Sequence, residues 1–404
     1  MGARSSWSAV VTVAAVVACG GEPAPSASAP EPKREPGTIT TLVGDGTQGF
    51  KSGATLRSSW LNQPTELAFD HDGRLHIVDW NAHRIRRVTD DGTLETIVGG
   101  AFPGDWPADI ALDDALPGTE LPINHPMDLA FADDGTMLIA AWHNHKLLSF
   151  DAETGLVRVV SGANRPGYAG DGAPAASGLM NFPDSLAIAP GGELLFADQR
   201  NNVVRRIDAT GALASVVGVK ALSGYRGDDG PASTAAFALC PYDEAGGSDN
   251  PPPGGPLALG EDGALYVADT YNHCVRRISP GSDGEVGAGD PSEELVETVA
   301  GKCGSPGYEA EPDAASLRFN LPHDIEVRGG ELYVADTGNH VIWRVHLASG
   351  APERIAGTGE PGMSPDGSAA LESRFDHPYG LGFDGEGNLY VADTLNNRIR
   401  VLWQ

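Results

Sequence analysis

Six short segments of this chain begin with proline, and four of them carry an acidic residue two positions later. The segments are Pro64-Thr65-Glu66, Pro126-Met127-Asp128, Pro183-Asp184-Ser185, Pro241-Tyr242-Asp243, Pro322-His323-Asp324 and Pro378-Tyr379-Gly380. Where such segments meet in space, the acids Glu66, Asp128, Asp243 and Asp324 form a ring of carboxyl groups. Like charges repel, so the ring must be solvated or must hold a cation. The chemistry it offers is divalent-cation binding or proton transfer by a carboxylate base, and the alternative is a set of solvated acids.

Tryptophan and histidine are concentrated between positions 60 and 145. The four tryptophans there are Trp60, Trp80, Trp106 and Trp142. Because tryptophan is enriched at the anchor points of interfaces, they suggest a binding patch. The alternative is that the rings pack loops against sheets. His125 and His143 are the histidine pair to test as metal ligands, although histidines in such places are usually part of turns.

Charge and motif content exclude several classes of function. The formal net charge of −28 argues against nucleic acid as a partner, because phosphate binding needs clustered lysine and arginine. The sequence contains no nucleophile elbow, phosphate-binding Walker loop, HExxH motif or CxxC motif. Arginine pairs such as Arg86-Arg87 alternate with isoleucine and valine, so they are interpreted as partners of nearby carboxylates.

The candidate residues belong to a unit that recurs six times at intervals of 57 to 71 residues. The copies read RLHIVDWNAHRIRRV (74–88), TMLIAAWHNHKLLSF (136–150), ELLFADQRNNVVRRI (193–207), ALYVADTYNHCVRRI (264–278), ELYVADTGNHVIWRV (331–345) and NLYVADTLNNRIRVL (388–402). Equivalent positions hold Asp79, Ala141, Asp198, Asp269, Asp336 and Asp393. A unit of this size repeated six times predicts a closed array of small sheets rather than a domain with a single core.

The fifth copy shows the plan of one unit. Residues 324–327 form a first strand, 332–335 a nearly all-apolar second strand, 341–345 an alternating third strand and 353–356 a fourth strand. Four antiparallel strands joined by turns make one blade of a propeller. The motif ADTGNHVIWRV (335–345) and glycine-rich loops such as GYAGDG (167–172) resemble the NHL repeat family, and the resemblance runs over about 38–404. It implies an all-β, six-bladed β-propeller.

Two families of enzymes with related propellers share some features with this sequence. Peptidyl-hydroxyglycine amidating lyases resemble the chain at Pro322-His323, where that family has a zinc-binding histidine. They use three such pairs on alternate blades, whereas Thr65 and Asp184 stand at the alternate positions here. Gluconolactonase-like propellers bind a divalent ion through acids at the channel mouth. The acidic ring is compatible with that arrangement, but no specific motif supports it.

Ring closure and the repeated aspartate have simple structural interpretations. The last copy stops after three strands, and Thr38–Val43 resembles a fourth strand. This N-terminal strand is therefore expected to complete the last blade and to leave no open edge. The repeated aspartate is expected to be structural, because a carboxylate at a strand end can accept backbone N–H bonds from the following turn.

The first residues resemble an export signal with a lipid-attachment site. Residues 1–18 combine Arg4 with a short apolar stretch, and Val16-Val17-Ala18-Cys19 resembles a bacterial lipobox. Cys19 is therefore the expected lipidation site, followed by a tether rich in Pro, Ala and Ser at 19–37 and by the propeller at 38–404. The expected location is the outer membrane of a Gram-negative cell, and an ordinary signal cleaved elsewhere is the alternative.

Export permits a disulfide among the three remaining cysteines. Cys274 opens the third strand of the fourth unit and Cys303 follows its fourth strand, so both are expected at the same sheet edge. We predict the pair Cys274–Cys303, with Cys240–Cys303 as the competing pair.

Two functions follow from these observations. The first is a lipid-anchored, non-enzymatic monomer that binds a protein, peptide or glycan of the cell envelope on the face of its long loops. The second is a metal-dependent lyase or lactone hydrolase at the channel mouth that uses calcium or zinc. The candidate binding residues are Glu66, Trp80, Asp128, Trp142, Asp184, Asp243, His323, Asp324 and Tyr379, of which Glu66, Asp128, His323 and Asp324 are the metal candidates.

Overall fold

A computed structural model describes residues 34–51, 55–241, 252–309 and 317–404 of the chain. Within it, Arg34–Gln404 forms one compact unit. The expected signal segment, the lipidation site Cys19, most of the tether and Asp243 lie outside the described residues. No helix in the described ranges is long and apolar enough to cross a membrane.

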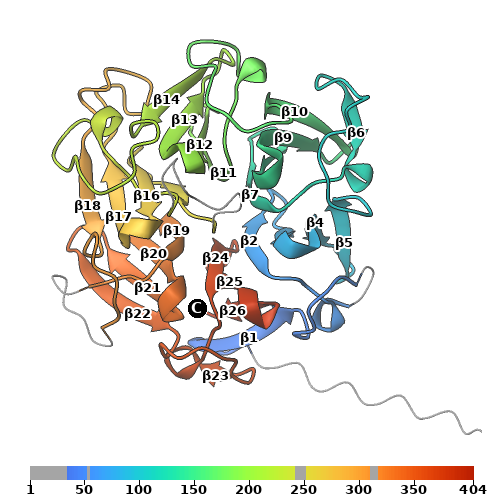
Figure 1. Cartoon of the computed structure of the whole chain (residues 1–404). Coiled ribbons are helices and arrows are strands. Elements are labelled where there is room, and N and C mark those ends of the chain that lie inside the picture. Colours follow the sequence, from blue (N-terminus) through green and yellow to red (C-terminus); the bar gives the residue numbers. More distant parts are fainter. Residues whose placement is uncertain (1–33, 52–54, 242–251, 310–316) are drawn as a thin grey trace, which may run out of the picture. The chain divides into compact units, whose positions relative to one another are not determined.

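The described residues form six antiparallel sheets arranged in a ring (Figure 1), which is the predicted six-bladed β-propeller. Blade 1 consists of β2 (Pro64–Phe69), β3 (Leu75–Asp79), β4 (Arg84–Val88) and β5 (Leu94–Val98). Blade 2 consists of β7 (Pro126–Phe131), β8 (Met137–Ala141), β9 (Lys146–Asp151) and β10 (Leu156–Gly162). Blade 3 consists of β11 (Pro183–Ile188), β12 (Leu194–Asp198), β13 (Val203–Ile207) and β14 (Leu213–Val217). Blade 4 consists of β15 (Leu257–Leu259), β16 (Leu265–Asp269), β17 (Cys274–Ile278) and β18 (Val296–Ala300). Blade 5 consists of β19 (Pro322–Arg328), β20 (Glu331–Asp336), β21 (Val341–His346) and β22 (Ala351–Ala356). Blade 6 consists of β24 (Pro378–Phe383), β25 (Leu389–Asp393), β26 (Arg398–Leu402) and β1 (Thr38–Val43).

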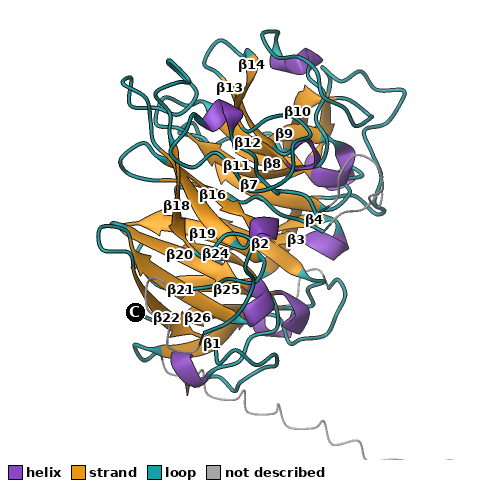
Figure 2. Cartoon of the chain, turned by 60° about the vertical axis from the view of Figure 1, so that its left-hand side comes forward, coloured by secondary structure: helices purple, strands orange, loops and turns teal. Residues whose placement is uncertain are grey.

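Two short strands extend the outer edges of blades 2 and 6, and the helices are single 3₁₀ turns in loops (Figure 2). The added strands are β6 (Ala115–Pro117) and β23 (Ser368–Ala369). Six turns follow the second strands: η2 (Trp80–Ala82), η4 (Trp142–Asn144), η6 (Gln199–Asn201), η8 (Thr270–Asn272), η9 (Thr337–Asn339) and η11 (Thr394–Asn396). Five lie in the connections between blades: η1 (Leu56–Ser58), η3 (Gly118–Glu120), η5 (Ala175–Ser177), η7 (Ala232–Thr234) and η10 (Ala370–Glu372).

The predicted closure of the ring is confirmed. Strand β1 pairs antiparallel with β26, with Ile39 opposite Leu402, and Figure 1 shows β1 beside β26 in one blade. The Trp403 indole N–H also donates to the Thr40 hydroxyl at 2.9 Å. Closure joins the first and last strands of the ring, so blades 6 and 1 become neighbours although they are distant in sequence.

The repeated aspartate is structural, as predicted, but its main donor differs from the one expected. In blade 1, Asp79 accepts the backbone N–H of Asn62 at 2.7 Å, and Asn62 lies in the loop before the first strand rather than in the following turn. The equivalent pairs are Asp198–Asn181, Asp269–Ala238, Asp336–Asn320 and Asp393–Asp376. The carboxylate therefore ties the end of the second strand to the start of its own blade.

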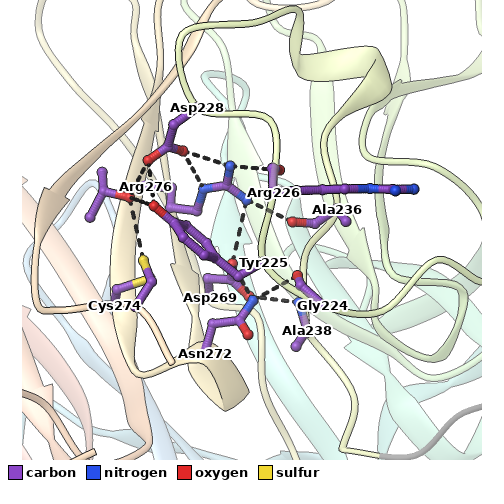
Figure 3. Close-up of polar contacts among 12 residues, drawn as sticks. Gly224, Tyr225, Arg226, Asp228, Ala236, Ala238, Asp269, Asn272, Cys274 and Arg276 are labelled. Atoms are coloured by element: carbon purple, nitrogen blue, oxygen red, sulfur yellow. Dashed lines mark hydrogen bonds and ion pairs between the residues drawn. A yellow bond between two sulfur atoms is a disulfide. The ribbon is translucent and has the colours of Figure 1, made fainter. Parts of the chain in front are cut away.

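In four blades this aspartate also faces a fully buried arginine of the third strand. The pairs are Asp79–Arg86, Asp198–Arg205, Asp269–Arg276 and Asp393–Arg400. Figure 3 shows this arrangement in blade 4, where Arg276 lies between Asp269 and the loop residue Asp228. Tyr225 donates its hydroxyl to the same Asp228 at 2.9 Å. The arginine thus holds the long glycine-rich loop against the sheet.

Adjacent blades are joined by a hydrogen bond that we call the latch. The residue after each of the six 3₁₀ turns that follow a second strand has a left-handed backbone conformation, with φ of 51–60°. Its side chain accepts a backbone N–H from the loop that enters the next blade. The six acceptor–donor pairs are His83–His125, His145–Phe182, Asn202–Leu239, His273–Leu321, His340–His377 and Asn397–Gln63, at 2.9–3.3 Å. Each of these histidines must carry no proton on Nδ1 in order to accept this bond, so its ring is neutral.

Candidate functional site

The innermost strands of the blades surround a central cavity of about 310 Å³, which we call the channel cavity. Strands β2, β7, β11, β15 and β19 contribute to its wall. In Figure 1 the labelled strands β2, β7, β11 and β19 lie towards the centre of the ring. Its acidic residues are Glu66, Asp128, Asp324 and Glu326. Three of the four expected acids therefore line one cavity, and Glu326 is an addition from the same strand as Asp324.

Enclosure of these four carboxyl groups raises the pKa of each one. Burial raises the pKa of Asp128 to about 6 and that of Glu326 to about 7. The pKa values of Glu66 and Asp324 are raised well above their usual range, first by burial and then by neighbouring carboxylates. The cavity therefore holds carboxyl groups that retain protons at pH values where exposed acids have lost them.

Two of the channel acids also bridge adjacent blades. Asp128 accepts the Leu186 backbone N–H at 2.6 Å and the Ser185 hydroxyl at 2.9 Å. Asp324 accepts the Leu381 backbone N–H at 2.6 Å. These two carboxylates therefore already accept hydrogen bonds that join blade 2 to blade 3 and blade 5 to blade 6, which leaves fewer lone pairs for a ligand.

A second cavity of about 150 Å³ lies where the first strands of blades 1 and 6 begin, and we call it the mouth pocket. The first strands start, the second strands end and the inter-blade loops emerge at this long-loop face, as the pairing of Pro64 with Asp79 shows. The mouth pocket is lined by Thr65, Trp80, Pro253, His377, Tyr379 and Leu395, among others. Two of the candidate binding residues, Trp80 and Tyr379, therefore share one pocket.

Two buried polar atoms of the mouth pocket have no hydrogen-bond partner among the described residues. They are the Thr65 hydroxyl and the Trp80 indole N–H, and Thr65 is only 5% exposed. Buried polar groups are satisfied in the great majority of cases, so each exception needs an explanation. A ligand that hydrogen-bonds to both atoms supplies one.

The position of Trp80 shows why its N–H is left over. In blades 4 to 6 the residue after the repeated aspartate is Thr270, Thr337 or Thr394, whose hydroxyl donates to the carbonyl of the proline that starts the next blade. Blades 1 to 3 have Trp80, Trp142 and Gln199 there. Trp142 donates to Gln199 at 2.8 Å, and Gln199 donates to the Pro252 carbonyl at 2.7 Å. Within the described residues, Trp80 takes no part in such a relay.

Tyr379 connects the mouth pocket with two other candidate residues. Its ring stacks on His323, with ring centroids 4.3 Å apart. Burial, together with the charge of Asp184, raises the pKa of Tyr379. Burial also raises the pKa of Asp184 to about 8, although its carboxylate accepts the Gly254 N–H at 3.1 Å. Thus Asp184, His323 and Tyr379 all lie at the channel mouth, as the sequence predicts for residues at the starts of the first strands.

His323 does not offer a clear ligand atom in this arrangement. Its Nδ1 lies 2.8 Å from the Leu321 carbonyl oxygen and its Nε2 lies 3.1 Å from the Pro253 carbonyl oxygen. Burial lowers the pKa of His323 to about 4. Both ring nitrogens thus face the backbone rather than the channel acids.

The expected patch of four exposed tryptophans is not formed, so that interpretation is wrong. Trp142 is 1% exposed and packs against Met127 and Phe182. Trp106 is 3% exposed and belongs to the apolar cluster between blades 1 and 2. Trp80 is half-buried and Trp60 is at the edge of exposure. The buried tryptophans of this region therefore serve as packing, and of the four tryptophans only Trp80 lines the mouth pocket.

Three histidines of blades 1 and 2 form a contiguous cluster, namely His83, His125 and His143. The Nδ1 atoms of His125 and His143 lie 2.7 Å apart, and the ring of His125 also packs against Trp80. Burial and the neighbouring His83 and His143 lower the pKa of His125 to about 3. The backbone N–H of His125 donates to His83, so the cluster is part of the latch between blades 1 and 2.

In the described part of the chain, one group of three His, Asp or Glu side chains brings ligand atoms within 4.8 Å of one another. It consists of His340, Asp376 and His377, which the sequence did not single out. His340 already accepts the His377 backbone N–H at Nδ1, and Asp376 faces the His377 ring at 2.8 Å. The four metal candidates Glu66, Asp128, His323 and Asp324 are not such a group. Their relation is a shared channel rather than a compact cage.

Cys274 and Cys303 form a disulfide with a Cα–Cα distance of 5.0 Å at the edge of blade 4. Cys240 is buried and is not part of this disulfide. The Thr298 hydroxyl lies 3.3 Å from the sulfur of Cys303 and donates to Asp228 at 2.7 Å. The disulfide therefore adjoins the polar network around Arg276 (Figure 3).

The fold and its sequence repeats define the class of protein. Residues 256–278 and 319–344, in blades 4 and 5, match the family model of the NHL repeat. The protein is thus a six-bladed β-propeller, two blades of which match the NHL repeat.

The chain is similar to parts of larger proteins from plants and animals. It is 27% identical to NHL repeat-containing protein 2 of Bos taurus, covering 86% of this chain and 47% of that protein. It is 24% identical to Protein SUPPRESSOR OF QUENCHING 1, chloroplastic, of Arabidopsis thaliana, covering 81% of this chain and 29% of that protein. The chain therefore spans less than half the length of these curated relatives.

Solved structures extend the likeness of fold. An auxiliary nutrient binding protein from Bacteroides thetaiotaomicron superposes with a TM-score of 0.63 at 15% identity, covering 90% of this chain and 75% of that chain. A gluconolactonase from Xanthomonas campestris superposes with a TM-score of 0.50 at 13% identity, covering 90% and 88%. At these identities the likeness concerns the fold alone.

Proposed function

We propose that this protein is a lipid-anchored, non-enzymatic propeller that binds a peptide, protein or glycan of the cell envelope at the mouth of its channel. The observation that carries the proposal is the mouth pocket, where the buried Thr65 hydroxyl and Trp80 N–H lack partners among the described residues. Leaving a buried donor unsatisfied costs roughly 1–3 kcal/mol, so a ligand that accepts these bonds gains affinity at this place.

The construction of the fold agrees with a binding role. Latches and the channel acids tie neighbouring blades together, so the elements that line the pocket are held in place. A nutrient-binding protein with the same fold is compatible with this role. Specificity then comes from the pocket's own side chains, because propellers of one fold serve many functions.

The mouth pocket is tested by blocking its rim. Leu395 lines the pocket and is 43% exposed, so L395E places a charge at the opening with little effect on the core. Leu371 is 50% exposed on η10 and does not line the mouth pocket, so L371E is the matched control. Binding of neutral oligosaccharides and of muropeptides from digested cell wall is measured by calorimetry. We expect L395E to weaken binding at least tenfold and L371E to leave it unchanged. Equal binding by both variants refutes the site.

The anchoring part of the proposal rests on Cys19 and on the expected signal before it. We expect the mature chain to begin at Cys19 and to carry lipid, which mass spectrometry of the purified N-terminal peptide measures. The C19A variant is expected to appear in the soluble fraction. A wild-type chain without lipid at Cys19 contradicts this part and leaves the binding site untouched.

A second candidate is a metal-dependent lyase or lactone hydrolase, carried by the four carboxyl groups that share the channel cavity. Oxygen ligands suit calcium better than zinc, and His323 has both nitrogens turned to carbonyls, so calcium fits these residues better. Stoichiometric calcium that is lost in D324A supports this function. Elemental analysis that finds no metal in protein purified with calcium present argues against it.

A further inference from the structure

We infer that the mouth pocket is a subsite for one neutral sugar ring, such as the terminal pyranose of a glycan. The inference rests on the proposed function and names the chemical class of its ligand. It follows from three properties of the pocket: its size, the kind of hydrogen-bonding atoms it leaves unused, and the charge around it.

Size and walls select a single ring. The cavity measures about 150 Å³, and an apolar cavity of about this volume in another protein holds one benzene molecule. Flat side chains surround it, namely the indole of Trp80, the phenol of Tyr379 and the imidazole of His377. One face of Tyr379 is covered by His323 and one side of Trp80 packs on His125, so these rings are fixed in place. Such rigid aromatic walls suit the C–H faces of a pyranose.

The unused atoms match hydroxyl groups. The Trp80 N–H can only donate, whereas the Thr65 hydroxyl can donate and accept. Neighbouring groups are already occupied: the Thr394 hydroxyl donates to the Pro64 carbonyl at 2.7 Å, and the His377 ring faces Asp376. A ring that bears adjacent hydroxyls provides an acceptor for Trp80 and a two-way partner for Thr65, which a purely apolar ring does not.

Charge argues against an anionic ligand. The chain has a formal charge of −28. A carboxylate or phosphate on the ligand is repelled by this field. A peptide is less suited than a sugar, because its backbone pairs one donor with one acceptor at each residue and the cavity holds only one ring.

The test uses two conservative substitutions in the full chain, of which T65V is nearly isosteric. T65V removes only the hydroxyl, and W80F removes the N–H while keeping an aromatic wall. T96V is the matched control, because the Thr96 hydroxyl is also buried and unpartnered among the described residues but lies on β5, outside the pocket. The probes are maltotetraose, cellotetraose and chitotetraose, with tetragalacturonate as the charged counterpart and tetra-alanine as the peptide.

We expect at least one neutral tetrasaccharide to bind, tetragalacturonate to bind more weakly, and T65V and W80F each to weaken neutral binding roughly 3- to 10-fold. T96V is expected to bind like the wild type. T65V should also melt no lower than the wild type, because it loses no intramolecular bond, and this separates a ligand contact from a structural role. Saturation-transfer NMR of the wild type, in which the terminal sugar ring receives saturation from aromatic protons, tests the site without any variant.

Several results overturn the inference. One is the absence of saturable binding by every neutral saccharide at 10 mM, on the order of the weakest affinities that matter for recognition. Another is binding that T65V and W80F leave unchanged. Binding of tetra-alanine that L395E abolishes refutes the sugar but leaves the proposed function standing, whereas a lack of any effect of L395E on any bound probe refutes both.

Discussion

Replacing His145 tests how the latch between blades 2 and 3 holds the ring together. The His145 Nδ1 accepts the backbone N–H of Phe182 at 3.3 Å, and its ring packs on the Phe182 ring with centroids 4.8 Å apart. His145 has a φ of 52° and Phe182 is 4% exposed. Two variants separate the contributions: H145A removes the acceptor, and H145N keeps one, since Asn202 and Asn397 perform the same task in blades 3 and 6.

The magnitude follows from the groups that lose their partners. In H145A the buried Phe182 N–H is left without its acceptor, which costs roughly 1–3 kcal/mol. Alanine also pays about 1 kcal/mol more than asparagine in the left-handed conformation. Both variants lose the ring contact, worth about 1 kcal/mol. At the lower end of these ranges, H145A is therefore about 3 kcal/mol less stable than the wild type and H145N about 1 kcal/mol less stable.

Hydrogen exchange at the Phe182 amide is the direct measurement. A difference of about 2 kcal/mol between the variants corresponds to roughly 30-fold faster exchange in H145A than in H145N. Amides of blade 5, far from the change, should exchange alike in both and serve as the internal control. Equal exchange in the two variants, or faster exchange in H145N, refutes the idea that the side-chain acceptor holds the blades together.

The same latch predicts that the stability of the fold depends on pH. Burial lowers the pKa of His145 to about 4, with His143, Lys146 and Arg200 adding to the effect and Asp105 opposing it. The unfolded chain takes up this proton near pH 6.5, whereas the folded chain resists until about pH 4. The stability contribution of His145 is therefore lost as the pH falls from about 6.5 towards 4, and H145N should flatten that part of the curve.

Two further substitutions probe the channel and blade 2. Burial raises the pKa of Asp184 to about 8, so the stability that its proton contributes is lost as the pH rises from about 4 to 8. The D184N variant has no carboxyl group to lose a proton, so its gain in melting temperature over the wild type should grow over that range and level off above it. A gain that does not vary with pH contradicts this reasoning. Restoring the repeated aspartate in blade 2 with A141D should destabilise the fold by roughly 2 kcal/mol or more, because the new carboxylate is buried beside Leu148 rather than an arginine. Denaturant unfolding checks this, and adding L148R should recover part of the loss; an A141D variant as stable as the wild type contradicts the reasoning.

The repeat explains why so much of the fold is predictable. Six copies of one unit reveal the strands, the blade count and the spare strand Thr38–Val43 that closes the ring, because each copy repeats the same alternation and turn residues. Details that depend on the path of a loop were less accessible. The donor to Asp79 is Asn62, which precedes the blade, and this follows from how the inter-blade loop curls back rather than from any local pattern.

The site was predictable only in part, for a related reason. Residues at the starts of the first strands were expected to converge, and Glu66, Asp128 and Asp324 line one cavity. Exposure was not predictable from residue type, so Trp142 was expected on the surface although it is buried. Glu326 was missed although it stands two residues after Asp324 on β19, where the alternation of a strand places both side chains on one face. His377 and Leu395 were missed because they reach the pocket from blade 6, which adjoins blade 1 only after closure.

Departures from the repeat differ in whether the structure compensates for them, and this difference identifies the site. In blade 2 the aspartate is replaced by Ala141, yet Asn144 accepts the Asn124 N–H at 2.8 Å in its place. Trp142 and Gln199 replace the threonine of later blades, yet they form a relay to a carbonyl. Trp80 replaces the same threonine, and its N–H remains without a partner in the described ranges. A compensated departure is neutral for stability, whereas one left uncompensated beside a cavity persists only if something outside the chain satisfies it. That reasoning favours the junction of blades 1 and 6, rather than the more irregular blade 2, as the place of the proposed ligand site.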